Sequence, residues 1–250
     1  MRRNPSTIIT AILLVWAGIS CNTVYQTSSL QYKTYRVGTG QRQDSAMRVF
    51  LQPYTEQVGK TMNEVLAVNP ESMDKKQPES VLGNFMTDAY FTMAMEKYNT
   101  RVDAAFMNYG GIRLNQLPAG DITVGKVFEL MPFDNLLVLQ KVKGKVLQQV
   151  LDLAAAKGGW PVTGLTMQIR NNKAVNVQVG GRPLDPEAEY TIVNSDFLAN
   201  GGDNLDMLRS IPQISNGYLM RDALMDYIRK LKSGGKKIGA NLENRVTYAQ

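Results

Sequence analysis

The feature of this chain that most constrains its fold is the change of its hydrophobic period along the sequence. Apolar residues recur at three- and four-residue intervals over residues 79–93 and 144–156, which predicts two amphipathic helices. Over residues 165–179 the period drops to two, and Asn171 and Asn172 divide the run, which predicts a β-hairpin. Helices and hairpins therefore interleave without a regular β-α-β alternation, and this favours an α+β fold over a doubly wound sheet.

Further elements complete this mixed helix–sheet domain. A helix is predicted from Asp44, with a stripe of apolar residues between Met47 and Val58, and Pro53 should kink or interrupt it. Shorter apolar runs predict strands near residues 65–68, 104–107, 136–142 and 190–193, and helices near residues 124–130 and 218–231.

The first 20 residues have the pattern of an export signal. Arg2 and Arg3 precede an apolar stretch, residues 8–16, that is too short to span a bilayer. Small residues follow, and then Cys21, the only cysteine of the chain. This order predicts a bacterial lipoprotein, cleaved before Cys21 and acylated on its thiol. The alternative is a chance cysteine beside an ordinary signal peptide.

The chain is thus divided into four parts. Residues 1–20 are a predicted signal peptide, residues 21–43 a polar tether, residues 44–64 a linker-type helix and residues 65–250 a single domain. We expect an exported protein, anchored to a membrane by lipid, in the periplasm or at the cell surface. The net charge of +6 is small and its basic residues are scattered, so nucleic acid is not an expected partner.

The chain contains no histidine. Imidazole is the commonest metal ligand and the usual general base near neutral pH. Most hydrolytic mechanisms are therefore closed to this chain alone, and we expect it to hold no metal or cofactor. It can still bind a small polar ligand.

The segment Phe-Leu-Ala-Asn-Gly-Gly-Asp at residues 197–203 is suited to such a ligand. Gly201 and Gly202 can adopt positive φ and let the backbone approach a ligand. Asp203 can accept hydrogen bonds from vicinal hydroxyls, as acidic residues do for ribose, and Phe197 offers a flat face for stacking. On composition alone, a structural interpretation is favoured, in which a strand ends in a tight turn and Phe197 lies in the core.

Two other turns carry residues of the same kind. Asn108 follows a predicted strand and can bond a heterocyclic base edge, and Arg113 can hold a phosphate through its planar guanidinium. The structural alternative is a strand-to-loop turn with a solvent-exposed arginine. Phe133 lies in a turn as well, so Phe133 and Phe197 could stack on both faces of a purine.

The order of these motifs resembles the C-terminal domain of the 5′-nucleotidase and UDP-sugar hydrolase family. The resemblance covers about residues 75–248 and extends to residues 44–64, which are similar to the helix that joins the two domains of full-length members. It depends on the motifs ESVLGNFMTDA at residues 79–89, NYGGIR at 108–113, GDIT at 120–123, Pro132-Phe133, Lys143-Gly144 and residues 197–203.

The resemblance implies roles for the candidate residues. Phe133 and Phe197 match the two aromatics that enclose the base, and Asn108 matches the residue at the base edge. Asp203 matches the acid on the ribose hydroxyls. Gly111 matches the glycine whose backbone lies against the ligand. Arg113 matches an arginine on the ribose–phosphate side.

Two departures from the family pattern affect the phosphate side. Family members place an arginine shortly before the 79–89 segment, where this chain has Lys75 and Lys76, and a lysine does not reproduce a bidentate contact. Tyr109 stands where the family usually has glycine. If that position requires positive φ, Tyr109 strains the loop or reshapes the site.

Full-length members hydrolyse the phosphoester in a separate N-terminal domain, with two metal ions held by Asp, His and Asn. A chain without histidine cannot supply those ligands. The resemblance therefore implies the nucleotide- or nucleoside-binding half of a 5′-nucleotidase-type hydrolase, with divalent metals only in a separately encoded metallophosphatase. The alternatives are a stand-alone nucleoside- or nucleotide-binding lipoprotein and a remnant that binds nothing.

Overall fold

The structure is a computed structural model that describes residue 29, residues 31–35 and residues 44–249. The predicted signal peptide, Cys21 and most of the tether lie outside the described residues. The chain divides into two units, residues 1–48 and residues 49–250. None of the helices in the described ranges is both long enough and apolar enough to cross a membrane.

Helix α2 (Ser45–Met62) begins where Asp44 caps it, since Asp44 Oδ1 accepts hydrogen bonds from the backbone N–H groups of Ala46 and Met47. The helix continues through Pro53, so of the two predicted effects, a kink or an interruption, the interruption does not occur. A proline removes one helical hydrogen bond, and in a helix with no buried residue the freed carbonyl can bond to water.

The remaining elements follow the predicted order. The longer segments match the sequence periods, whereas several two-residue strands form only by pairing with distant parts of the chain. The helices are α3 (Val81–Tyr98), α4 (Val124–Leu130), α5 (Gly144–Ala156), α6 (Asp196–Ala199) and α7 (Met220–Ser233), with the 3-10 turns η1 (Tyr109–Gly111), η2 (Gly202–Asn204) and η3 (Asp206–Leu208); the strands are β1 (Val65–Asn69), β2 (Met73–Asp74), β3 (Ala104–Phe106), β4 (Gln116–Leu117), β5 (Gly120–Thr123), β6 (Leu137–Lys143), β7 (Val162–Thr163), β8 (Leu165–Arg170), β9 (Lys173–Val179), β10 (Arg182–Pro183), β11 (Glu189–Ser195), β12 (Gln213–Ile214) and β13 (Val246–Tyr248).

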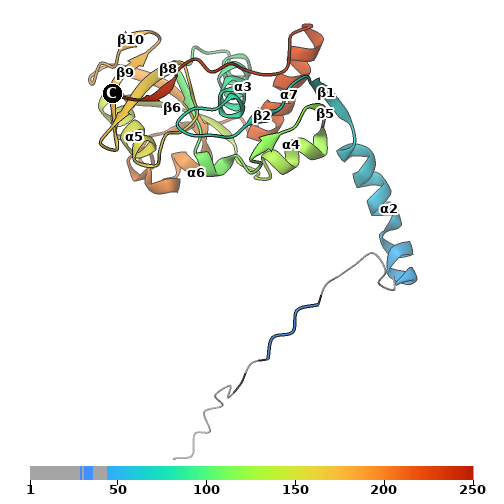
Figure 1. Ribbon diagram of the computed structural model, residues 1–250. Helices are drawn as coiled ribbons and strands as arrows, with labels where there is room; N and C mark the ends of the chain where they lie inside the picture. The colour runs from blue at the N-terminus through green and yellow to red at the C-terminus, as the bar shows by residue number, and fades with distance from the viewer. Residues whose placement is uncertain (1–28, 30, 36–43, 250) are drawn as a thin grey trace, which may run out of the picture. The chain divides into compact units, whose positions relative to one another are not determined.

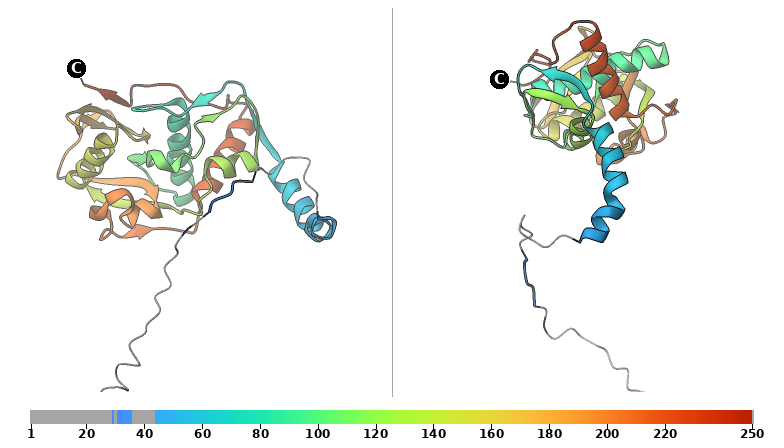
Figure 2. Two further views of the ribbon diagram at one scale, coloured as in Figure 1. Left: turned by 60° about the horizontal axis from the view of Figure 1, so that its bottom comes forward. Right: turned by 90° about the vertical axis from the view of Figure 1, so that its right-hand side faces the viewer.

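A five-stranded sheet in the order β12-β6-β11-β3-β7 carries the core on both faces. Alternate side chains of its strands point to opposite faces. Ala105 and Val193 join the apolar cluster that includes α3 and α7, and these helices lie side by side (Figure 1; Figure 2). Ala104 and Ile192 join the second cluster, with α5 and the predicted hairpin β8-β9. This arrangement confirms the α+β prediction.

The Lys143-Gly144 motif begins α5 and has a packing role. A Cβ at Gly144 would collide with the backbone carbonyl of Asp185 and would lie 3.0 Å from the Cα of Pro186. Both obstacles are backbone atoms, which cannot rotate away as a flexible side chain could. Gly144 is therefore required by the close approach of two chain segments.

We expect Gly144→Ala to lower the free energy of unfolding by about 1–3 kcal/mol, because overpacking forces the backbone to shift. Urea denaturation measures the loss. Gly59→Ala is the matched control, since the nearest atom to a Cβ there lies 4.0 Å away and alanine favours the helix. Equal unfolding midpoints for the two variants would contradict this account.

The 79–89 segment, which carried much of the family resemblance, fastens the C-terminal part of the chain. Ser80 caps α3 by accepting a hydrogen bond from Gly83 N at 3.0 Å. Asn84 donates to the backbone carbonyl of Asn241 at 2.8 Å, and Asp88 forms an ion pair with Arg245 at 2.7 Å. The motif is thus structural at these positions.

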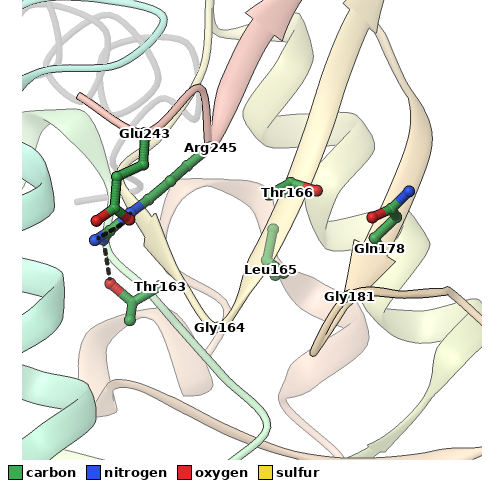
Figure 3. A pocket seen from close by; sticks show the side chains of 8 residues that line it. All are labelled: Thr163, Gly164, Leu165, Thr166, Gln178, Gly181, Glu243 and Arg245. Carbon is green, nitrogen blue, oxygen red and sulfur yellow. Dashed lines mark hydrogen bonds and ion pairs between the residues drawn. The ribbon is translucent and has the colours of Figure 1, made fainter.

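Arg245 also borders a surface pocket of about 230 Å³, with Thr163 and Glu243 beside it (Figure 3). Its guanidinium donates to Asp88, Glu243, Thr163 and the carbonyl of Val162. Because these partners occupy the guanidinium, Arg245 belongs to the scaffold, and this pocket is not our candidate site.

Candidate functional site

The candidate residues come from loops at one edge of the central sheet. Strands β3 and β11 are parallel, so Asn108 and Phe197, which follow them, leave the sheet at the same edge. Strand β6 is antiparallel to β11, and its first residue, Leu137, pairs with Ser195, the last residue of β11. The loop that carries Phe133 therefore enters the sheet at this edge too.

Phe197 is not in the core, so the structural interpretation favoured by composition alone is wrong. Phe197 is 46% exposed, and Phe133 is 38% exposed. The reason is local: Ser195 Oγ accepts a hydrogen bond from Leu198 N at 3.2 Å and begins the short helix α6. In this helix Leu198 is buried, and Phe197 is turned outward.

Two sets of hydrogen bonds hold the Phe133 turn in place. Leu136 N donates to Asp196 Oδ1, and Asp196 N donates to the Leu136 carbonyl, both at 3.0 Å. Arg221 of α7 donates to the carbonyl of Phe133 at 3.2 Å and to Asp134 at 2.6 Å. The backbone of the turn is thus fixed next to α6, while the Phe133 ring stays exposed.

Asn108 and Asp203, which are 95 positions apart in the sequence, are in direct contact. Asn108 Nδ2 donates to Asp203 Oδ2 at 2.6 Å. The other carboxylate oxygen of Asp203 lies 3.1 Å from Lys157 Nζ. Asp203 has a φ of 56°, and Gly201 has a φ of 91°. Positive φ therefore falls on Gly201 and Asp203, and not on Gly202 as the sequence allowed. It lies in the left-handed region that aspartate tolerates better than most residues.

The two remaining glycines of the site are required because other atoms of the site lie close to their backbone. A Cβ at Gly202 would lie 2.5 Å from two atoms of the Phe197 ring, so this ring packs on the glycine backbone. A Cβ at Gly111 would lie 2.9 Å from Asn108 Oδ1. Both glycines let the neighbouring site residue lie close to the chain.

Tyr109 does not strain the 108–113 loop. Its backbone lies in the 3-10 turn η1 and has no positive φ. Lys75 Nζ lies 4.0 Å from the centre of the Tyr109 ring and donates to the Ile112 carbonyl at 2.7 Å. Lys76 points elsewhere and pairs with Asp74 at 3.2 Å. Of the two lysines, the structure brings Lys75 to the loop.

Arg113 extends the positive charge of this loop. Its side chain is exposed, as the structural alternative expected, but its guanidinium carbon lies 5.7 Å from the centre of the Phe133 ring. Burial, followed by the charge of Arg113, lowers the pKa of Lys75 from its ordinary value. Two cations thus flank the loop next to one of the exposed aromatics.

Lys157 and Arg221 also contact the site residues and were not predicted from the sequence. Lys157 follows α5, where a basic residue is expected simply because of the helix dipole, and Arg221 lies within a predicted helix. The segment Lys-Gly-Gly-Trp at residues 157–160 directly follows the helix predicted over residues 144–156. No local signal identifies Lys157, because its contacts are with Asp203, 46 positions away in the sequence.

The arrangement combines two exposed aromatic rings, a carboxylate in contact with an amide, and a cationic loop. Such groups can stack on a flat ring, accept hydrogen bonds from hydroxyls and hold an anion. Within residues 29, 31–35 and 44–249, no group of three or more His, Cys, Asp or Glu side chains is placed to hold a metal ion.

A family model, described as the C-terminal domain of 5′-nucleotidase, matches residues 57–210, which is more than half of the chain. The chain belongs to this family. The resemblance stated from the motifs is thereby confirmed. Membership in the 5′-nucleotidase C-terminal domain family describes what kind of domain this is, and the activity of a whole enzyme does not follow from it.

Similar proteins are longer than this 5′-nucleotidase C-terminal domain. Protein UshA of Yersinia enterocolitica is 29% identical over 194 residues, which are 75% of this chain and 35% of that protein. Cell wall protein Lmo0130 of Listeria monocytogenes is 29% identical over 211 residues, 77% of this chain and 27% of that protein. The structure of a 5′-nucleotidase precursor from Thermus thermophilus aligns with a TM-score of 0.70 and 31% identity, over 81% of this chain and 43% of that one. The chain spans about one third of the length of the curated relatives.

Proposed function

We propose that this protein is the nucleotide-binding half of a 5′-nucleotidase-type phosphoester hydrolase in nucleotide catabolism, and that it acts with a separately encoded metallophosphatase. The observation that carries the proposal is the contact of Asn108 with Asp203 at the sheet edge from which Phe133 and Phe197 project into solvent. Family membership gives these residues a common context.

The proposed roles follow from the chemistry of each group. Phe133 and Phe197 stack on the two faces of the base. Asp203 accepts hydrogen bonds from the ribose hydroxyls. The amide nitrogen of Asn108 is engaged by Asp203, which leaves its carbonyl oxygen for an amino group on the base edge.

The cationic loop forms the phosphate side in this proposal. Arg113 supplies a planar guanidinium, and Lys75 supplies a point charge beside it. Gly111 has no side chain, so its backbone can lie against the ligand. The phosphate then faces outward, toward the metallophosphatase that cleaves the ester. Divalent metals belong to that partner.

The exposed face of α2 supports a protein partner. Phe50, Leu51, Tyr54 and Val58 are all exposed and recur at the spacing of one helix face. A stripe of large apolar side chains in water is a common mark of an interaction surface. We propose that the metallophosphatase covers this stripe, because the match to protein UshA of Yersinia enterocolitica covers only 35% of that longer protein.

The proposed location is outside the cytoplasm, with a lipid anchor on Cys21 and no nucleic-acid partner. The order of residues 2–21 supports export, and the relative in Listeria monocytogenes is described as a cell wall protein. Mass spectrometry of the purified membrane form tests the anchor: a diacylglyceryl mass on Cys21 supports it, and a free thiol contradicts it.

Reconstitution tests the function. When the purified protein is mixed with the candidate metallophosphatase, we expect kcat/KM for AMP hydrolysis to rise about tenfold or more, since binding positions the phosphate. Leu51→Asp should abolish the gain without weakening AMP binding. Leu242→Asp is the matched control, because Leu242 is an exposed leucine outside α2.

The other outcomes separate the alternatives. AMP binding without any gain in hydrolysis, across metals and nucleotides, refutes the two-polypeptide enzyme and leaves a stand-alone nucleotide-binding protein. Flat calorimetry with AMP, adenosine and a nucleotide sugar leaves a remnant that binds nothing.

A further inference from the structure

Lys157 contacts Asp203 twice, although the two residues are 46 positions apart. Its ammonium donates to Asp203 Oδ1 at 3.1 Å and to the Asp203 backbone carbonyl at 3.2 Å. One side chain therefore fixes both the carboxylate and the peptide of the residue that we propose to bind the sugar.

The turn that carries Lys157 is itself held in place. Gln77 Nε2 donates to the carbonyls of Lys157 and Gly159, both at 2.7 Å. Trp160 is buried, and the centre of its ring lies 5.6 Å from Lys157 Nζ. A lysine on a freely moving turn would gain little from a surface ion pair, but this one starts from a fixed backbone and a fixed ring.

Asp203 needs such support because of its backbone. Its φ of 56° lies in the left-handed region, which few non-glycine residues occupy. Asn108 holds Oδ2 and Lys157 holds Oδ1, so each carboxylate oxygen has one protein partner. A carboxylate oxygen offers two acceptor sites. One acceptor site on each oxygen is left, which is the number that two vicinal hydroxyl groups require.

We infer that Lys157 is a positioning residue that presets Asp203 for a ribose diol and thereby sets the preference of this site for ribonucleotides. The inference rests on the proposed function, because it concerns the same site. Lys157 also balances the negative charge of Asp203, so that covering the carboxylate with a neutral sugar leaves no unpaired charge.

Calorimetric titration with two probes tests the inference. AMP carries the diol, and 2′,3′-dideoxy-AMP carries the same base and phosphate without it. In Lys157→Met we expect the Kd of AMP to rise about tenfold, as for loss of a well-placed hydrogen-bonding partner, and the Kd of dideoxy-AMP to stay unchanged. Lys157→Arg should restore part of the difference, because it keeps a donor and a charge.

Lys173→Met is the matched control. Lys173 forms an ion pair with Asp152 at 3.1 Å, the same separation as in the Lys157–Asp203 pair, but on the hairpin side of α5. This variant should leave both Kd values unchanged. An equal rise in the Kd of both probes in Lys157→Met would show that Lys157 has a merely structural role. Tighter AMP binding would show that Lys157 competes with the sugar. Either result overturns the inference. If the wild-type protein binds neither probe, the proposed function fails first.

Discussion

Replacing Arg245 with methionine is expected to lower the free energy of unfolding by about 3 kcal/mol. The Arg245 side chain is 9% exposed and forms a two-point ion pair with Asp88, at 2.7 and 3.0 Å. It also donates to Thr163 at 2.7 Å and to the Val162 carbonyl at 3.1 Å. Removal of one partner leaves a largely buried carboxylate without its counter-charge, and this is the costly change.

The deficit should not vary across the neutral pH range. Burial by itself lowers the pKa of Arg245, but the hydrogen bonds and charges of Asp88 and then Glu243 raise the pKa above its ordinary value. A raised folded-state pKa gives stability that is fully present below the unfolded pKa and is lost only as pH rises through the folded value. For arginine that window is strongly alkaline.

Urea denaturation of matched variants measures the effect. Arg229→Met is the control, because Arg229 forms ion pairs with Glu64 and Asp226 at the surface and should contribute less than about 1 kcal/mol. The double variant Asp88→Leu/Arg245→Met should be less destabilised than Arg245→Met alone, since no carboxylate is left unpaired. If Arg245→Met is no less stable than Arg229→Met, this role for Arg245 is ruled out.

The Asp88–Arg245 ion pair joins distant parts of the chain, and such long-range contacts could not be predicted from the sequence. Hydrophobic periods predicted α3, α4, α5, α7 and the β8-β9 hairpin, because each period is a local property. Strand β13 was not predicted: its three residues pair with β8, about 80 positions away, and gain their conformation from that pairing. Pro53 does not interrupt α2, because it removes only one helical hydrogen bond and the freed carbonyl of this exposed helix can bond to water.

The site was predicted in its residue types but not in its contacts. Asn108 and Asp203 were both identified, yet their hydrogen bond depends on two loops that the parallel pairing of β3 and β11 brings together. The exposure of Phe197 depends on a cap at Ser195, which composition does not reveal. Lys157 was missed because its role exists only through Asp203.

The largest expected effect on function comes from the two aromatic rings. We expect Phe133→Ala and Phe197→Ala each to raise the Kd for AMP about 5- to 150-fold, since base–aromatic stacking contributes about 1–3 kcal/mol per ring. The double variant should lose close to the sum of the two effects if the rings contact opposite faces of one base. The same sum would arise for AMP if the two rings contacted separate parts of it. Adenosine has the same base without the phosphate and is therefore the decisive second probe: two rings on one base should show the same sum with adenosine.

Both rings are already exposed in the free protein, so their removal should cost little stability, and the unfolding midpoint of each variant checks this. Tyr248→Ala is the matched control, because Tyr248 is an exposed aromatic on β13, in the four-stranded sheet β10-β9-β8-β13. Replacement of either phenylalanine by tyrosine keeps the flat face and should preserve most of the affinity. Unchanged AMP binding in both alanine variants would separate these rings from base recognition, because a base held between them cannot lose either ring without a measurable loss of affinity.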